Sequence, residues 1–140
     1  MQEQDSIDAL NERAPHFIAL LGGRVIGVDS EARTCTFEFN VVEDFCHSVD
    51  VVQGGFVTAM LDAAMSHAMF AHDEFGGLAG VSSLEIKTSF LEPTRAGRLL
   101  AIGRILKSTY KTAFMEALLY NEDGELTATA STVAKLPRQG

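Results

Sequence analysis

The sequence predicts a single α+β domain over residues 1–140, in which a curved antiparallel sheet of five to six strands wraps one long central helix at about residues 54–74. Three observations predict this fold. Residues 56–71 contain twelve apolar side chains spread around the helical axis, four strand-like segments follow them, and a strand-like hairpin precedes them. A helix that is apolar on nearly every side needs such a covering sheet.

The first element that we expect is an N-terminal helix over residues 6–21. Ser6 is a candidate N-cap, Pro15 interrupts or restarts the helix, and Gly22-Gly23 ends it. The segment is amphipathic, so the helix should lie on the domain like a lid.

A half-buried hairpin is expected over residues 24–41. Its second run alternates the apolar Cys35, Phe37 and Phe39 with polar residues, and a turn around residues 29–31 joins the two runs.

The long helix is rich in Ala, Met and Leu, contains no proline and is closed by Gly76-Gly77. The strand-like segments that follow are separated by proline, glycine or polar turns, so we expect four successive antiparallel strands. They span residues 80–93, 97–109, 111–124 and 125–136. Long open edge strands invite pairing, which a homodimer that joins two sheets edge to edge would prevent.

Charge and composition exclude several classes of function. The net charge is −8 with no basic block, which argues against nucleic acid or an anionic membrane surface as partner. Cys35 and Cys46 form no CxxC and no zinc-ligand spacing, so we expect neither a disulfide nor a metal site. The apolar stretch at 51–71 contains Asp62 and His67, which favours a buried helix over a membrane span. With an acidic N-terminus unlike a signal peptide, these features predict a cytoplasmic protein.

Three polar residues form a stripe on the long helix. Thr58, Asp62 and Ser66 follow an i, i+4, i+8 spacing, which places them on one face. Aspartate is unfavourable in the middle of a helix and is rarely buried without a partner. Asp62 is therefore either paired with a buried donor for structural reasons or used for catalysis or ligand contact.

The start of this helix is a second candidate site. Gln53-Gly54-Gly55 leaves backbone N–H groups unpaired, and glycine lets a ligand approach them closely. The N–H of Gly54 or Gly55 could stabilise the oxyanion of a docked thioester. The alternative is an ordinary tight entry into a buried helix.

These residues carry a resemblance to a known family. His47, Gln53-Gly54-Gly55, Asp62 and the segment GVSSLEIKTSFLEPTRAG occur in the order and spacing of hotdog-fold acyl-CoA thioesterases of the phenylacetyl-CoA and 4-hydroxybenzoyl-CoA type, the PaaI-like enzymes. The likeness covers about residues 40–136. It implies the hotdog fold, with no cofactor beyond the coenzyme A of the substrate.

The resemblance also implies a role for each matched residue. Asp62 would be the nucleophile or the general base, and Gly54 the oxyanion donor. Ser66 and Ser83 would position the water or the substrate. The site would lie at the interface of a homodimer, within a dimer-of-dimers tetramer, with Asp62 and Ser83 drawn from different chains.

Two positions depart from the family pattern. The family often has histidine where Gln53 stands, and asparagine or glutamine where His47 stands. Gln53 can donate and accept hydrogen bonds but cannot exchange a proton, so the role of base falls to Asp62. His47 either orients the carbonyl or a water, or is a solvated loop residue.

Coenzyme A is anionic and the chain is acidic, so its nucleotide should meet a local set of cations. Our preferred contacts are Arg95 and the pair Lys107-Ser108, with Gly55 and Thr58 as further substrate contacts. His67 and His72 late in the helix are interpreted as structural.

The predicted function is hydrolysis of a small or medium acyl-CoA, aliphatic or aromatic. The alternative is a non-catalytic hotdog module that binds acyl-CoA or a fatty-acyl group.

Overall fold

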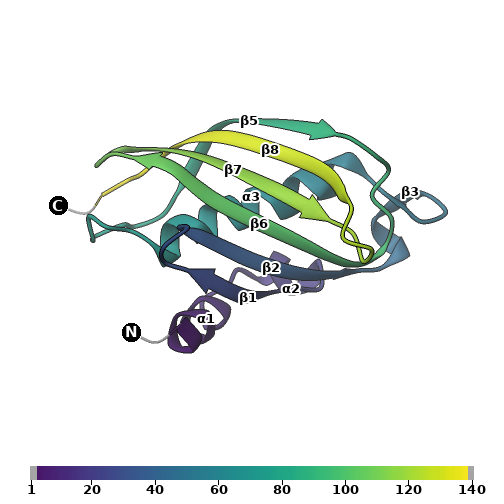
Figure 1. Cartoon of the computed structure of the whole chain (residues 1–140), viewed down its shortest axis with the longest axis horizontal. Helices are drawn as coiled ribbons and strands as arrows, with labels where there is room; N and C mark the ends of the chain where they lie inside the picture. The colour runs from purple at the N-terminus through teal and green to yellow at the C-terminus, as the bar shows by residue number, and fades with distance from the viewer. Residues whose placement is uncertain (1–2, 139–140) are drawn as a thin grey trace.

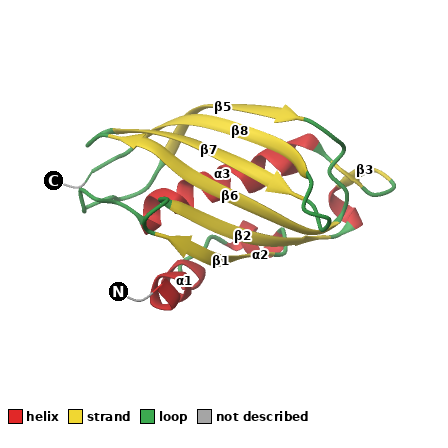
Figure 2. Ribbon diagram, in the orientation of Figure 1, coloured by secondary structure: helices red, strands yellow, loops and turns green. Residues whose placement is uncertain are grey.

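The computed structural model describes residues 3–138 and confirms the predicted α+β class. A six-stranded antiparallel sheet curves around one long helix in the hotdog arrangement, as Figures 1 and 2 show. The elements are α1 (Glu3–Glu12), α2 (His16–Leu20), β1 (Gly23–Asp29), β2 (Thr34–Val41), a 3-10 turn (Glu43–Phe45), β3 (Cys46–Ser48), β4 (Val51–Val52), α3 (Gly54–Ala71), β5 (Ser82–Phe90), β6 (Gly97–Ser108), β7 (Thr112–Tyr120) and β8 (Leu126–Lys135).

Helix α3 is the predicted central helix, with 18 residues. It ends at Ala71 rather than near residue 74, and Gly76 and Gly77 adopt positive φ in the loop that follows. Most of its apolar side chains are buried against the concave face of the sheet, whereas Phe56 and Phe70 are exposed. Within residues 3–138, no helix has the length and apolar character to cross a membrane.

The order of the strands differs from the four successive neighbours that the sequence predicts. The sheet runs β1-β2-β6-β7-β8-β5, so β6, β7 and β8 do form a meander, whereas β5 pairs with β8 at the far edge. The loop after β5 crosses the end of the sheet, where the Leu91 N–H donates to the Thr127 carbonyl oxygen. Local patterning identifies a strand, but the choice of neighbour depends on packing against α3.

The N-terminal segment forms two helices instead of one interrupted helix. Helix α1 begins by Glu3, so Ser6 lies inside it and is not its N-cap. Pro15 is the N-cap residue of α2, as the predicted restart requires. Helix α1 is tied to β1 through Asn11, whose side chain accepts from the Val25 N–H at 2.7 Å and donates to the Val25 carbonyl at 3.0 Å.

The predicted hairpin is β1 and β2, with Cys35, Phe37 and Phe39 completely buried. Glu38, on the polar side of β2, is also buried. Its carboxylate accepts from Arg98 Nε at 2.7 Å, and this bond lowers the pKa of Glu38, assisted by Asn40 and Arg24. The buried charge is therefore paired rather than isolated.

Both cysteines are free thiols. Burial raises the pKa of the Cys35 thiol to about 12, so it is protonated and unreactive at neutral pH.

Gly103 sets how closely α3 approaches the sheet. A Cβ at this position of β6 would collide with the backbone carbonyl of Ala64 in α3. We expect Gly103→Ala to lower the free energy of unfolding by about 3 kcal/mol, because rigid backbone must move to admit it. Gly27→Ala is the matched control, since its Cβ would meet Thr36 at an ordinary 3.6 Å. Denaturant unfolding of the two variants checks this, and equal stabilities would contradict it.

Candidate active site

Asp62 and Ser83 meet within one chain. Ser83, in β5, donates a hydrogen bond from Oγ to Oδ1 of Asp62 at 2.9 Å. This corrects the expectation that the two side chains come from different subunits: β5 lies beside α3 in its own chain. The Asp62 carboxylate is half-buried, and its second oxygen has no bonding partner among residues 3–138. One oxygen is thus fixed while the other is available to a water or a substrate.

The polar stripe of α3 also contacts β5 through Thr58. The hydroxyls of Thr58 and Thr88 share a hydrogen bond at 3.0 Å, so Thr58 and Asp62 both face this strand. Ser66 instead donates from Oγ to the backbone carbonyl of Asp62 at 2.8 Å. Its hydroxyl supports the helix backbone beneath the carboxylate rather than the carboxylate itself.

Gln53 caps the N-terminus of α3. Its side-chain Oε1 accepts from the N–H of Gly55 at 2.8 Å and from that of Phe56 at 3.3 Å. The N–H of Gly54 has no bonding partner in the described part of the chain. The two candidate oxyanion donors are therefore distinguished: the Gly55 N–H is occupied by the cap and the Gly54 N–H is open.

The ring of Phe90 lies beside Gly54 at the start of α3. A Cβ on Gly54 would lie 3.1 Å from the ring of Phe90, at the end of β5. Phe90 is 55% exposed, and Phe56, in the first turn of α3, is also exposed. The sequence did not indicate Phe90 as part of the site, because its place beside Gly54 depends on where β5 lies in the sheet. Together Phe56 and Phe90 give the helix start an apolar rim.

Asp62 and Gly54 lie on the same helix, eight residues apart. At 1.5 Å per residue the separation along the axis is about 12 Å. This is too far for both groups of one helix to act on a single carbonyl carbon.

His47 lies on the small β3–β4 hairpin, at the end of the molecule where α3 begins (Figure 1). It is exposed, and its Nδ1 shares a hydrogen bond of 2.7 Å with the hydroxyl of Ser48.

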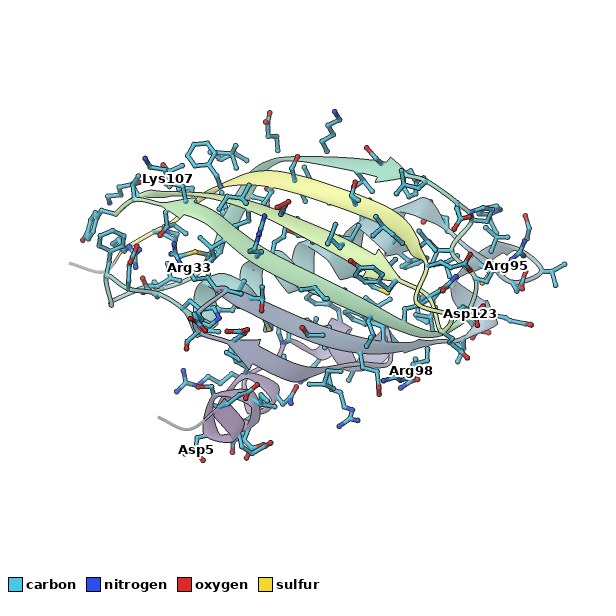
Figure 3. All side chains as sticks on the ribbon, in the orientation of Figure 1. Asp5, Arg33, Arg95, Arg98, Lys107 and Asp123 are labelled. Carbon is cyan, nitrogen blue, oxygen red and sulfur yellow. The ribbon has the colours of Figure 1, made fainter. Side chains whose placement is uncertain are left out.

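The cations chosen for coenzyme A lie apart. Figure 3 shows Arg95 and Lys107 at opposite ends of the sheet. Arg95 is paired with Asp50 at 2.7 Å, in a cavity of about 540 Å³ that is also lined by one further cation, Arg98, and by four acidic residues, Glu92, Glu122, Asp123 and Glu125. Ser108 is engaged with Arg33 at 3.0 Å and with Glu74 at 3.1 Å. One nucleotide cannot meet all three residues of a single chain.

Side chains able to bind a metal ion do not cluster in the part of the chain that the structure describes. Residues 3–138 contain no cluster of three or more His, Cys, Asp and Glu side chains that could hold an ion.

Comparisons with known proteins identify the family that carries this site. Residues 50–128, which include α3 and strands β5, β6 and β7, match the family model described as the Thioesterase superfamily. The chain belongs to this superfamily. The matched segment of this thioesterase-superfamily member includes Gln53, Gly54, Asp62 and Ser83, whereas His47 precedes it.

Several solved structures share the fold over nearly the whole chain. A phenylacetic acid degradation-related protein of Ralstonia eutropha JMP134 is similar with a TM-score of 0.82 and 29% identity, covering 94% of this chain and 99% of that one. The PaaI protein of the phenylacetic acid degradation operon of E. coli is similar with a TM-score of 0.81 and 19% identity, covering 98% of this chain and 93% of that one. A thioesterase of Haemophilus influenzae is similar with a TM-score of 0.82 and 17% identity, covering 94% of this chain and 90% of that one. No curated protein matches the chain.

His67 gives this superfamily member a pH-dependent stability. Burial lowers the pKa of His67 below 6.5, and its hydrogen bond to the Ala63 carbonyl opposes this only in part. The unfolded chain therefore binds the proton more tightly, so stability is complete above about pH 6.5 and declines as the pH falls below it. We expect denaturant unfolding at pH 7 and pH 5 to show a smaller loss in His67→Asn than in the wild type. Equal losses would contradict this role.

Proposed function

We propose that the chain is an acyl-CoA thioesterase that hydrolyses a small or medium acyl-CoA, aliphatic or aromatic, to the free acid and coenzyme A. The observation that carries the proposal is the Asp62 carboxylate, half-buried on an apolar helix, with one oxygen held by Ser83 and the other open. Membership of the Thioesterase superfamily supports the reaction class. The resemblance of about residues 40–136 to PaaI-like acyl-CoA thioesterases supports the choice of acyl-CoA.

Asp62 can act by either of two balanced routes. As nucleophile, its open oxygen attacks the thioester carbonyl, the C–S bond breaks, and the thiolate leaves and takes up a proton; water then cleaves the resulting anhydride. As general base, Asp62 accepts a proton from water while the water oxygen attacks the same carbon, and the C–S bond breaks with protonation of the thiolate. Both routes release the free acid and the thiol and regenerate the carboxylate.

The Gly54 N–H is the proposed oxyanion donor. It lies at the positive end of α3, and the Gln53 cap already satisfies its two neighbours, Gly55 and Phe56. Gln53 thus acts as a positioning residue for the helix start. We expect His47 to contact the substrate or a water from the adjacent hairpin, and Ser66 to act through the helix backbone.

We infer that the working unit is a homodimer in which Gly54 of one chain faces Asp62 of the other. The separation of about 12 Å along one helix supports this arrangement. Strand β5 also ends the sheet as an open edge, where Leu84 is 65% exposed. A second pairing into a dimer-of-dimers tetramer would cover the exposed Leu106 and Phe114 on β6 and β7.

Contacts to coenzyme A would then be shared between chains. Arg95 of one subunit and Lys107 of another could approach one nucleotide, which a single chain does not allow. Gly55 and Thr58 stay predicted substrate contacts. Ser108 also stays one, provided that the substrate replaces Arg33 or Glu74 as its hydrogen-bond partner. The cytoplasmic location predicted from the sequence also stays a prediction.

A non-catalytic acyl-CoA or fatty-acyl binding module is the second candidate. It is favoured by Gln53, whose amide oxygen is consumed in capping and which cannot exchange a proton.

A thiol-release assay over acyl-CoA esters of graded size separates the two candidates. The proposed function predicts turnover of at least one ester. Equilibrium binding of the same esters without release of thiol would instead support the binding module.

A further inference from the structure

A cavity of about 640 Å³ lies between α1 and the C-terminal half of α3. Its walls are mainly apolar and include Leu10 and Pro15 from the N-terminal segment, Phe70 from α3 and Leu78 from the loop beyond. Arg13 and His67 supply polar groups. The volume suits a small organic molecule.

The walls of this cavity are held in place. Arg138 donates from Nη1 to both carboxylate oxygens of Asp73, at 2.7 and 2.8 Å, and pairs through its backbone with Leu78. Asp73 and Leu78 both line the cavity. On the other side, the bonds of Asn11 to Val25 fix α1 against β1. The cavity is therefore preformed, and the charge of Asp73 is already neutralised by Arg138.

His67 presents an unused hydrogen-bond acceptor at this cavity. His67 is only 4% exposed, and its ring packs edge-on against Phe37 and Phe70. Nδ1 lies 2.8 Å from the Ala63 carbonyl oxygen. Because a carbonyl can only accept, Nδ1 carries the proton and Nε2 is the acceptor. Nε2 has no partner among residues 3–138, and it is not fully buried: the one sealed side-chain nitrogen or oxygen without a partner in this part of the chain is Nη2 of Arg138. Because His67 lines the cavity, its acceptor is open to a bound molecule.

We propose that this cavity binds a small uncharged molecule with an apolar body and one hydroxyl group, such as an alkylphenol, whose hydroxyl donates to Nε2 of His67. Charged ligands are disfavoured here. The lone pair of Nε2 would repel an anion, and the positive charge of Arg13 at the rim would repel a cation. The proposal goes beyond the thioesterase function. His67 is turned about 140° from Asp62 around the axis of α3, so this site lies on another face of the helix.

The test uses 4-methylphenol and toluene, which differ by one hydroxyl, titrated into the full-length chain and followed by amide chemical shifts. We expect saturable shifts within residues 6–15 and 67–78, and about fivefold tighter binding of the phenol. Equal affinities, or shifts confined to residues 53–62 and 82–90, would overturn the proposal.

Two variants make the test specific to the cavity. In His67→Asn the side-chain amide can still donate to the Ala63 carbonyl but Nε2 is gone, so the preference for the phenol should disappear. Ala9→Leu should fill the cavity from α1 and abolish the binding of both probes, with folding checked by thermal unfolding. Asp62→Asn should change neither affinity, so failure of this site and failure of the thioesterase function are distinguishable. A preference retained in His67→Asn would overturn the proposal.

Discussion

Replacement of Asp62 by asparagine is expected to lower the rate of thiol release by about 10²–10⁴-fold, the usual contribution of a positioned acid or base. Asparagine has nearly the same shape, and its side-chain oxygen can still accept the hydrogen bond that Ser83 donates at 2.9 Å. The fold should therefore persist while the open oxygen loses its charge and its ability to take a proton. Steady-state kinetics with the best acyl-CoA ester measure the effect.

The same chemical change elsewhere is the control for this variant. Asp5→Asn alters an exposed carboxylate on α1, far from the site, and should leave the rate unchanged. The midpoint of thermal unfolding should agree between the wild type and both variants. Undiminished turnover by a folded Asp62→Asn protein would exclude Asp62 as the catalytic carboxylate.

Replacement of Gly54 by proline is expected to lower the rate by about 10²–10³-fold, because it removes the one N–H proposed to stabilise the oxyanion. Gly54 is the first residue of α3, where proline is well tolerated. The preceding Gln53 has φ −63° and ψ 138°, the extended conformation that a following proline requires. The substitution should thus remove a donor without disturbing the helix.

Gly54→Ala is the matched control for the proline variant. It adds the same Cβ 3.1 Å from the exposed ring of Phe90 but keeps the N–H. We expect most of the activity to remain in Gly54→Ala, with a change in KM where the rim of the site is affected. If the alanine and proline variants were equally impaired, the cause would be the added carbon and not the lost donor.

The sequence predicted the central helix and the first hairpin because their signals are local. Helix α3 is apolar on nearly every side, and the alternation in β2 matches its burial except at the buried Glu38. The position of β5 at the far edge of the sheet was not predictable in this way. Nothing in residues 80–93 indicates that their partner is β8 and not β6, since that choice depends on how the whole chain packs.

The candidate site shows the same division between local and long-range information. Helical spacing placed Thr58 and Asp62 on one face, and both do bond to β5. The meeting of Asp62 with Ser83 of its own chain depends on the strand order, and the family resemblance had implied that Ser83 comes from the other subunit. The cap formed by Gln53 depends on a side-chain rotamer, and the separation of Arg95 from Lys107 depends on the length of the sheet.

A complementation experiment tests most directly the central claim, that Asp62 of one chain and Gly54 of another act on one thioester. Asp62→Asn and Gly54→Pro chains with different affinity tags are co-expressed, and the mixed dimer is purified through both tags. One of its two sites would combine an intact Asp62 with an intact Gly54, so we predict about half of the wild-type activity from two inactive parents. A mixed dimer as inactive as its parents would contradict the shared site.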